Sequence, residues 1–126
     1  MRASEIARLL HADILTFSEQ ADAIEVATAC GSDMMSDVIA FVKERVALLT
    51  GLTNPQVIRT AELLDIKVII FVRGKKPSAE LVAMAQEQGI VLMTTRDTMF
   101  TACGKLYCAG IKGDTLAMPA SAAERS

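Results

Sequence analysis

The stretches Leu48–Pro55 (LLTGLTNP) and Ile69–Pro77 (IIFVRGKKP) each carry an apolar run that stops at a glycine and is followed by a proline. Short continuous apolar runs are typical of buried strands in parallel sheets, and proline is favoured at the first position of a helix. About one helix length of chain separates the two stretches. The pattern therefore predicts repeated strand–helix units of an α/β domain.

The same plan extends over the second half of the chain. Strands are predicted at 46–50, 67–72 and 90–93, each followed by a helix, which predicts right-handed crossovers and a parallel sheet. The predicted helix N-caps are Asn54, Ser78 and Asp97, and Gly89 is the predicted left-handed stop. The inward faces are predicted to be Val57, Ile58, Ala61 and Leu64, then Leu81, Met84 and Ala85, then Phe100, Cys103 and Tyr107.

The two ends of the chain predict smaller elements. A helix over 4–10 and a short strand over 14–17 form a lead-in, and an alternating strand is predicted over 24–29. Ser32 is the predicted N-cap of a further helix, whose apolar stripe is Met35, Val38, Ile39 and Val42. Residues 111–114 are predicted to add an edge strand, and residues 115–126 to be flexible.

Length and charge narrow the class of protein. With 126 residues and 52% hydrophobic composition, the chain suits one domain, which we expect over residues 1–114. The formal charge of −2 gives no reason to expect nucleic-acid binding. We expect a cytoplasmic protein without a membrane partner, because the sequence shows neither a signal peptide nor an apolar run of about 20 residues.

The residues that most often carry metal or redox chemistry are sparse. Cys30, Cys103 and Cys108 form no C-x-x-C pair, and the last two do not share a helix face, so we interpret them as structural thiols. His11 is interpreted as a helix-end residue, and Asp33 with Asp37 as a helix-start pair that complements the helix dipole. No metal and no cofactor are expected.

The turns that follow the predicted strands resemble those of a DRTGG domain. The resemblance covers roughly residues 23–113 and is carried by the turns at 51–55 and 73–77 and by the segment 95–98. It is closest to free-standing DRTGG proteins and is similar, more distantly, to the N-terminal domain of HPr kinase/phosphorylase. Where the family has Asp-Arg this chain has Leu52-Thr53, and where it has Thr-Gly-Gly this chain has Val72-Arg73-Gly74.

The resemblance implies a three-layer α/β/α fold with a mainly parallel sheet of about five strands. It also implies a regulatory or adaptor module without chemistry of its own. The sequence contains no phosphate-binding G-x-x-x-x-G-K-[ST] motif and no G-x-S-x-G motif, and we predict that the protein is not an enzyme.

A candidate binding site follows from the parallel sheet. Strand C-termini and helix N-termini share one edge, where unpaired N–H groups attract anions. We therefore expect a small anionic, phosphate- or nucleotide-bearing ligand at this edge. The candidate ligand-binding residues are Thr50, Gly51, Thr53, Asn54, Arg73, Gly74, Lys75, Lys76, Thr95, Arg96 and Thr98, with the Thr94 hydroxyl beside them.

Two other interpretations stay open. Free-standing DRTGG proteins tend to be encoded among iron-only hydrogenase genes, which implies an accessory role in hydrogenase assembly or redox regulation, with a hydrogenase-related partner and a functional cysteine. The second is an enzyme of unrecognised type that uses Arg73 and Arg96 on an anionic substrate. We also expect a symmetric homodimer, because 52% of the residues are apolar and only 22% are charged.

Overall fold

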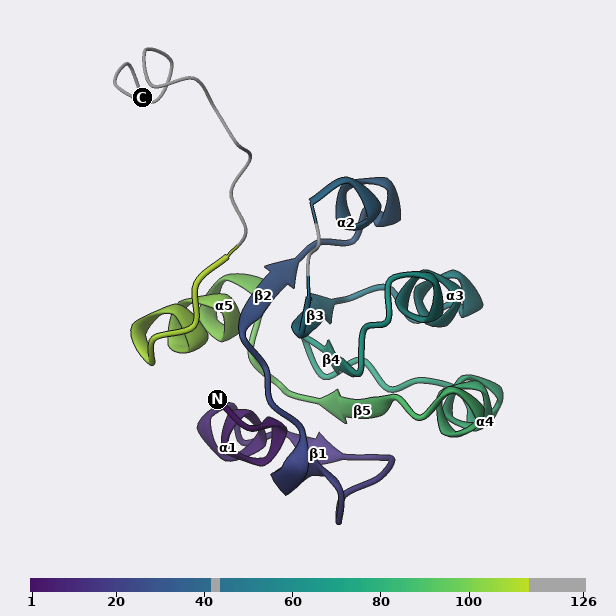
Figure 1. Ribbon diagram of the computed structural model, residues 1–126, viewed down its shortest axis with the longest axis horizontal. Helices are drawn as coiled ribbons and strands as arrows, with labels where there is room; N and C mark the ends of the chain where they lie inside the picture. The colour runs from purple at the N-terminus through teal and green to yellow at the C-terminus, as the bar shows by residue number, and fades with distance from the viewer. Residues whose placement is uncertain (42–43, 114–126) are drawn as a thin grey trace.

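The computed structural model describes residues 1–41 and 44–113, which form three layers, with helices on both faces of one sheet (Figure 1). The elements are α1 (Ala3–Leu9), β1 (Asp13–Ile14), the 3-10 helix η1 (Ala21–Ala23), β2 (Thr28–Gly31), α2 (Met35–Phe41), β3 (Val46–Thr50), α3 (Pro55–Leu63), β4 (Val68–Phe71), α4 (Ala79–Gln88), β5 (Val91–Thr94) and α5 (Met99–Cys108). The expected three-layer α/β/α class is confirmed.

The sheet has five strands in the order β1-β5-β4-β3-β2. Strands β2 to β5 run parallel, and β1 pairs antiparallel with β5 at one edge, so the sheet is mainly parallel as predicted. Thr50, Phe71, Thr94 and Asp13 are successive partners across four strands. This row marks the edge at which β3, β4 and β5 end.

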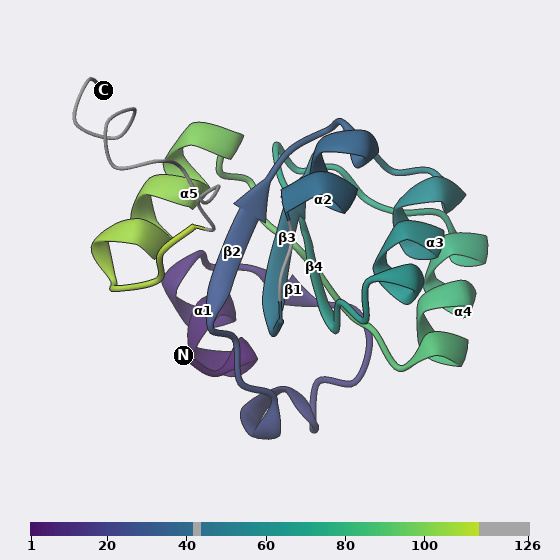
Figure 2. The same cartoon turned by 45° about the horizontal axis from the view of Figure 1, so that its top comes forward.

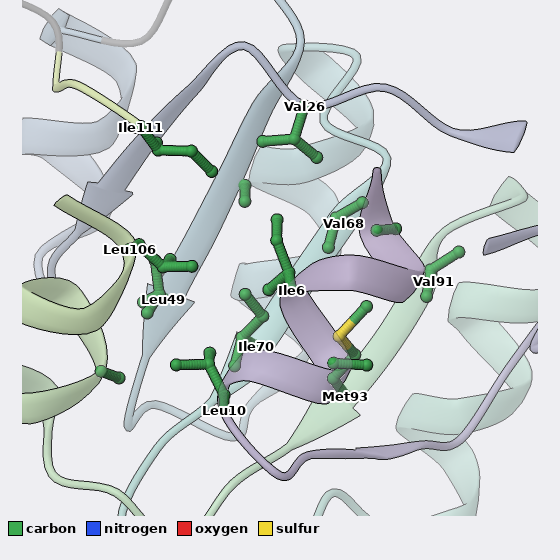
Figure 3. Close-up of a cluster of buried hydrophobic side chains, with 14 of the residues drawn as sticks. Ile6, Leu10, Val26, Leu49, Val68, Ile70, Val91, Met93, Leu106 and Ile111 are labelled. Atoms are coloured by element: carbon green, nitrogen blue, oxygen red, sulfur yellow. The ribbon is translucent and has the colours of Figure 1, made fainter. Parts of the chain in front are cut away.

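The continuous apolar strands are explained by burial on both faces of the sheet. Leu49, Ile70 and Met93 point toward α1 and α5, where they join one core with Ile6 and Leu106 (Figure 3). Their neighbours along the strands point to the other face. Leu48, Ile69 and Leu92 pack there with residues of α2, α3 and α4.

In the second half of the chain, most predicted helix ends are confirmed and one is wrong. Asn54 caps α3 through Gln56 N, with Pro55 first in the helix, and Ser78 caps α4 through Leu81 N. Gly89 ends α4 with φ +70°, a left-handed value that favours glycine. For α5, however, the N-cap is Thr98 rather than Asp97. Asp97 instead forms an ion pair with Lys105, which lies in the last turn of that helix.

Of the three residues predicted to face inward on α5, Cys103 packs against the core as predicted, but Phe100 and Tyr107 do not. Phe100 is 88% exposed and Tyr107 59% exposed, whereas Ala102 and Leu106 are buried. The buried stripe continues through Met99 and the half-buried Cys103. The predicted set of residues and the buried set both have helical spacing. The buried set contains the small residues Ala102 and Cys103, which allow α5 to pack closely on the sheet. A side chain on Gly31 of β2 would come within 2.6 Å of Cys103 Sγ, so α5 lies directly against that strand.

The strand predicted at 24–29 is displaced toward the C-terminus. Strand β2 begins at Thr28, and the preceding residues pair with the N-terminus instead, through Ala3 N to Ile24 O and Val26 N to Met1 O. Ile24 and Val26 still pack inward, because this segment passes beside α1. The inward-facing residues before Thr28 therefore reflect packing beside α1 rather than pairing within the sheet.

Three further details differ from the sequence prediction. Helix α2 starts at Met35, so Ser32 is not its cap, and the Ser32 hydroxyl accepts from Met34 N in the turn before it. Met35 and Val38 of the predicted stripe are buried, Ile39 is 48% exposed, and Val42 lies outside the described residues. At 111–114 the structure has one bridge, from Lys112 to Thr28, while Asp114 and the predicted flexible tail lie outside the described residues.

Candidate functional site

The three loops of the predicted site are neighbours at the C-terminal edge of the sheet. We call residues Thr50–Asn54, Arg73–Lys76 and Thr94–Thr98 the rim. In Figure 2 the ends of β2, β3 and β4 reach one edge of the sheet. The third loop crosses over the end of β4, where Arg73 N donates to Asp97 O and Gly74 N to Thr95 O, both at 2.8 Å.

Arg73 has an unusual backbone. Its φ is +60° and that of the following Gly74 is +67°, so the turn has two successive left-handed residues. This conformation costs an arginine about 1–2 kcal/mol and costs glycine almost nothing. The DRTGG resemblance places a glycine at the same position. The turn therefore does not need Arg73, and the guanidinium is the feature that this side chain adds.

The Arg73 guanidinium lies on Gly51. A Cβ on Gly51 would be 3.0 Å from Arg73 Cζ and would overlap the nearest guanidinium nitrogen. Gly51 is held in turn by Asp33, whose Oδ1 accepts from Gly51 N at 2.7 Å and from the Thr50 hydroxyl at 3.0 Å. Asp33 therefore lies just before α2 and ties the end of β3 to the loop after β2, while Asp37 is in the first turn of α2, as interpreted from the sequence.

Beside this contact lies a cavity of about 350 Å³, which we call the rim cavity. Its lining is polar and comes from the turn after α1, the loop after β4 and the loop after β5. The lining residues are Leu10, His11, Asp13, Gly74, Lys76, Thr94, Thr95, Arg96 and Asp97. His11 and Asp13 were not among the predicted site residues, because only the antiparallel pairing of β1 with β5 brings them there.

Most polar groups of the rim other than the cations already bond within the protein. The Thr94 hydroxyl donates to Lys75 O at 2.7 Å, and the buried Thr95 hydroxyl donates to Leu10 O at 2.8 Å. Asn54 and Thr98 cap α3 and α5. Thr53 is half-buried in the loop before α3. The groups best placed to meet a ligand are therefore the exposed cations Arg73, Lys75, Lys76 and Arg96.

These cations are not neutralised by neighbouring acids. Within residues 1–41 and 44–113, no carboxylate lies within ion-pair distance of Arg73, Lys76 or Arg96. The nearest acid of the same loop, Asp97, pairs with Lys105 at 2.8 Å. An anion at the rim would therefore meet positive side chains that are not already held in ion pairs.

A second depression, of about 330 Å³, lies at the opposite edge of the sheet. Its charged lining residues are Glu25, Glu44, Arg45, Asp65 and Lys67. Asp65 pairs with Lys67 at 3.0 Å, and Glu25 pairs with the chain N-terminus at 3.3 Å. Its acids outnumber its bases, so it does not favour an anion.

The cysteines do not form a redox pair in this structure. Cys30 packs in the core beside α2, α3 and α4, whereas Cys103 packs in the core on the other face of the sheet. Burial raises the pKa of the Cys103 thiol, which lowers its reactivity. Across the described ranges, no group of three or more His, Cys, Asp or Glu side chains is arranged to hold a metal ion.

The fold is similar to that of a known regulatory region. One solved structure with this fold is the CBS and DRTGG domains of the regulatory region of Clostridium perfringens pyrophosphatase, complexed with its activator diadenosine tetraphosphate. The TM-score is 0.68 at 20% sequence identity, over 80% of this chain and 44% of that one. The present chain therefore spans less than half of the matched chain, and the likeness is one of fold.

Other comparisons give no family. No protein-family model matches the sequence, and no curated protein matches it. None of the helices within the described ranges is long and apolar enough to cross a bilayer.

Proposed function

We propose that this protein is a non-enzymatic regulatory module that binds a small phosphate- or nucleotide-bearing anion at the rim. The observation that carries the proposal is the set of cations without acid partners at the C-terminal edge of the sheet. Arg73 contributes most to the argument, because it occupies a strained backbone position and its guanidinium fits onto Gly51. A guanidinium presents paired N–H donors that match phosphate and carboxylate oxygens.

The structural neighbour supports a regulatory role of this kind. That pyrophosphatase region is described as binding a nucleotide activator, which is an anion with several phosphates. At 20% identity the neighbour does not identify the ligand of this chain.

A thermal-shift screen of nucleotides and phosphorylated metabolites should identify a ligand, because binding to the folded state raises the unfolding temperature. The double variant Arg73→Ala/Arg96→Ala should then weaken binding by roughly 2–4 kcal/mol. This is less than the sum of two charge-assisted contacts of about 1.5–3 kcal/mol each, because solvent screens exposed charges. Its free energy of unfolding should change by less than about 1 kcal/mol, because both side chains are exposed. Arg59→Ala, an exposed arginine on α3, is the matched control and should bind as the parent does.

Gly51→Ala offers a second, independent test. The added methyl group takes the place of the Arg73 guanidinium, which is the flexible end of a side chain and can move away. The variant should fold normally and bind the ligand more weakly than the parent. Unchanged affinity in both Gly51→Ala and the double arginine variant would rule out the rim as the binding site.

A further inference from the structure

The rim has two separate cationic positions. The crossing formed by the Arg73 N–Asp97 O and Gly74 N–Thr95 O bonds places Arg73 on the side of Gly51. Lys76 and Arg96 line the rim cavity, but Arg73 does not. A ligand in the cavity would therefore meet Lys76 and Arg96 first, and the turn after α1 would form its opposite wall.

That wall carries the chain's single histidine. His11 has φ +49°, and the carbonyl just before it, Leu10 O, accepts the buried Thr95 hydroxyl at 2.8 Å. The last turn of α1 is thus fixed to the end of β5. Thr95 itself lines the cavity, so the bond from its hydroxyl to Leu10 O fixes the position of His11 relative to Arg96.

The charges around the cavity can be counted by element. The turn after α1 and strand β1 supply His11 and Asp13, the loop after β4 supplies Lys76, and the loop after β5 supplies Arg96 and Asp97. Lys105 pairs with Asp97, which leaves two cations facing Asp13 when His11 is neutral. Protonation of His11 would add a third cation and leave two positive charges in excess.

We propose that the rim cavity binds a doubly charged oxyanion, such as a phosphate group, and that protonation of His11 strengthens this binding. The proposal rests on the proposed function and adds the part of the rim that holds the anion and the condition that controls it. Histidine is the side chain whose ordinary titration falls between pH 5 and 8. Affinity for the anion should accordingly be higher when His11 is protonated than when it is neutral.

Sulfate is the probe, because its charge stays constant between pH 5.5 and 8 while that of phosphate does not. We expect the parent protein to bind sulfate roughly thirtyfold more tightly at pH 5.5 than at pH 8, the effect of one added unit charge on a doubly charged anion at contact distance in water. His11→Gln should bind at pH 5.5 as weakly as the parent does at pH 8. Asp13→Asn should bind more tightly than the parent at both pH values, and Lys76→Gln more weakly at both.

Because the chain has one histidine, proton NMR can follow its imidazole directly. Binding and protonation are reciprocal, so saturating sulfate should move the midpoint of the imidazole titration to higher pH. Equal sulfate affinity at the two pH values, with an unmoved midpoint, would overturn the role of His11 while leaving anion binding at the rim intact. No sulfate binding at any pH would overturn the cavity as an anion site, and the Arg73 and Gly51 variants would still test the other side of the rim.

Discussion

Arg73 combines a backbone cost with an exposed charge, which is unusual for a surface residue. Its φ of +60° is a left-handed value that favours glycine. Its guanidinium contacts Gly51 rather than pairing with an acidic side chain. A residue selected for stability alone would be glycine or asparagine at this position. Stability therefore does not explain why an arginine occupies this position in the rim.

Replacing this residue should separate the backbone cost from the charge. We expect Arg73→Gly to have a free energy of unfolding about 0.5–1 kcal/mol higher than Arg73→Ala, because alanine keeps the left-handed strain. Urea denaturation of the two variants measures the difference. A glycine variant less stable than the alanine variant would show that position 73 does not hold a left-handed backbone in solution.

The cysteines should differ in reactivity according to their burial. Cys108 is exposed, whereas Cys103 is half-buried and its pKa is raised, so less of it is the reactive thiolate near neutral pH. Labelling with a maleimide at pH 7 should modify Cys108 first, and Cys103 labelling should accelerate as the pH rises toward that higher pKa. Cys108→Ser and Cys103→Ser identify the phases that belong to these two thiols. Faster labelling of Cys103 than of Cys108 would contradict the packing of α5 described above.

Strand β1 has only two residues, and its position depends on a hydroxyl that follows it. The Thr16 hydroxyl donates to Ile90 O at 2.7 Å and accepts from Leu92 N at 2.8 Å, at 3% residue exposure. Leu15 N adds a third bond to this part of β5, at Leu92 O. The Thr16 hydroxyl therefore supplies hydrogen bonds to the β5 segment that a longer β1 strand would otherwise make.

Thr16→Val should lower the free energy of unfolding by about 2–4 kcal/mol, because it leaves a buried donor and a buried acceptor unpaired. Thr16→Ser keeps both bonds and should lose less than half as much. The measurement is the urea midpoint of each variant. A valine variant with the parent's midpoint would mean that water or another group replaces the hydroxyl.

The strand–helix units were predictable because their signals are local. Asn54 with Pro55, Ser78 and Gly89 each act within one turn of chain, and all are confirmed. The face of α5 was not predictable, because Phe100 and Tyr107 have the same helical spacing as the stripe that is buried. Only the close approach at Gly31, which depends on distant parts of the chain, selects between the two.

The candidate site divides in the same way. The parallel sheet brings the three loops of the rim to one edge, as the sequence predicted. The contribution of His11 and Asp13 could not be predicted, because it depends on β1 pairing antiparallel beside β5, and two residues give no pairing signal in sequence. The contact between Arg73 and Gly51 likewise depends on side-chain packing between separate loops.

Several large apolar side chains are on the surface, with Phe100 and Leu63 the most exposed at 88% and 71%. A chain of 13.5 kDa with such residues favours self-association, and we expect a homodimer. Sedimentation velocity at micromolar concentration should show twice the monomer mass. Phe100→Ser and Leu63→Ser then indicate which surface is used. A single 13.5 kDa species across this concentration range would refute the homodimer.

The place of β1 in the sheet also fixes the order in which the molecule can be completed. The hydrogen bonds that join residues 10–16 to residues 90–95 include three made by threonine hydroxyls, across sequence separations of 74, 76 and 85 residues. On the ribosome, at about 5–20 residues per second, the first helix must therefore wait for several seconds before its partners exist. Ile6 and Leu10, which end in the core, stay without their final contacts during that time. The lead-in is thus synthesised well before its partners and docks late, and the wall of the rim cavity that carries His11 closes only after residues 90–95 have been made.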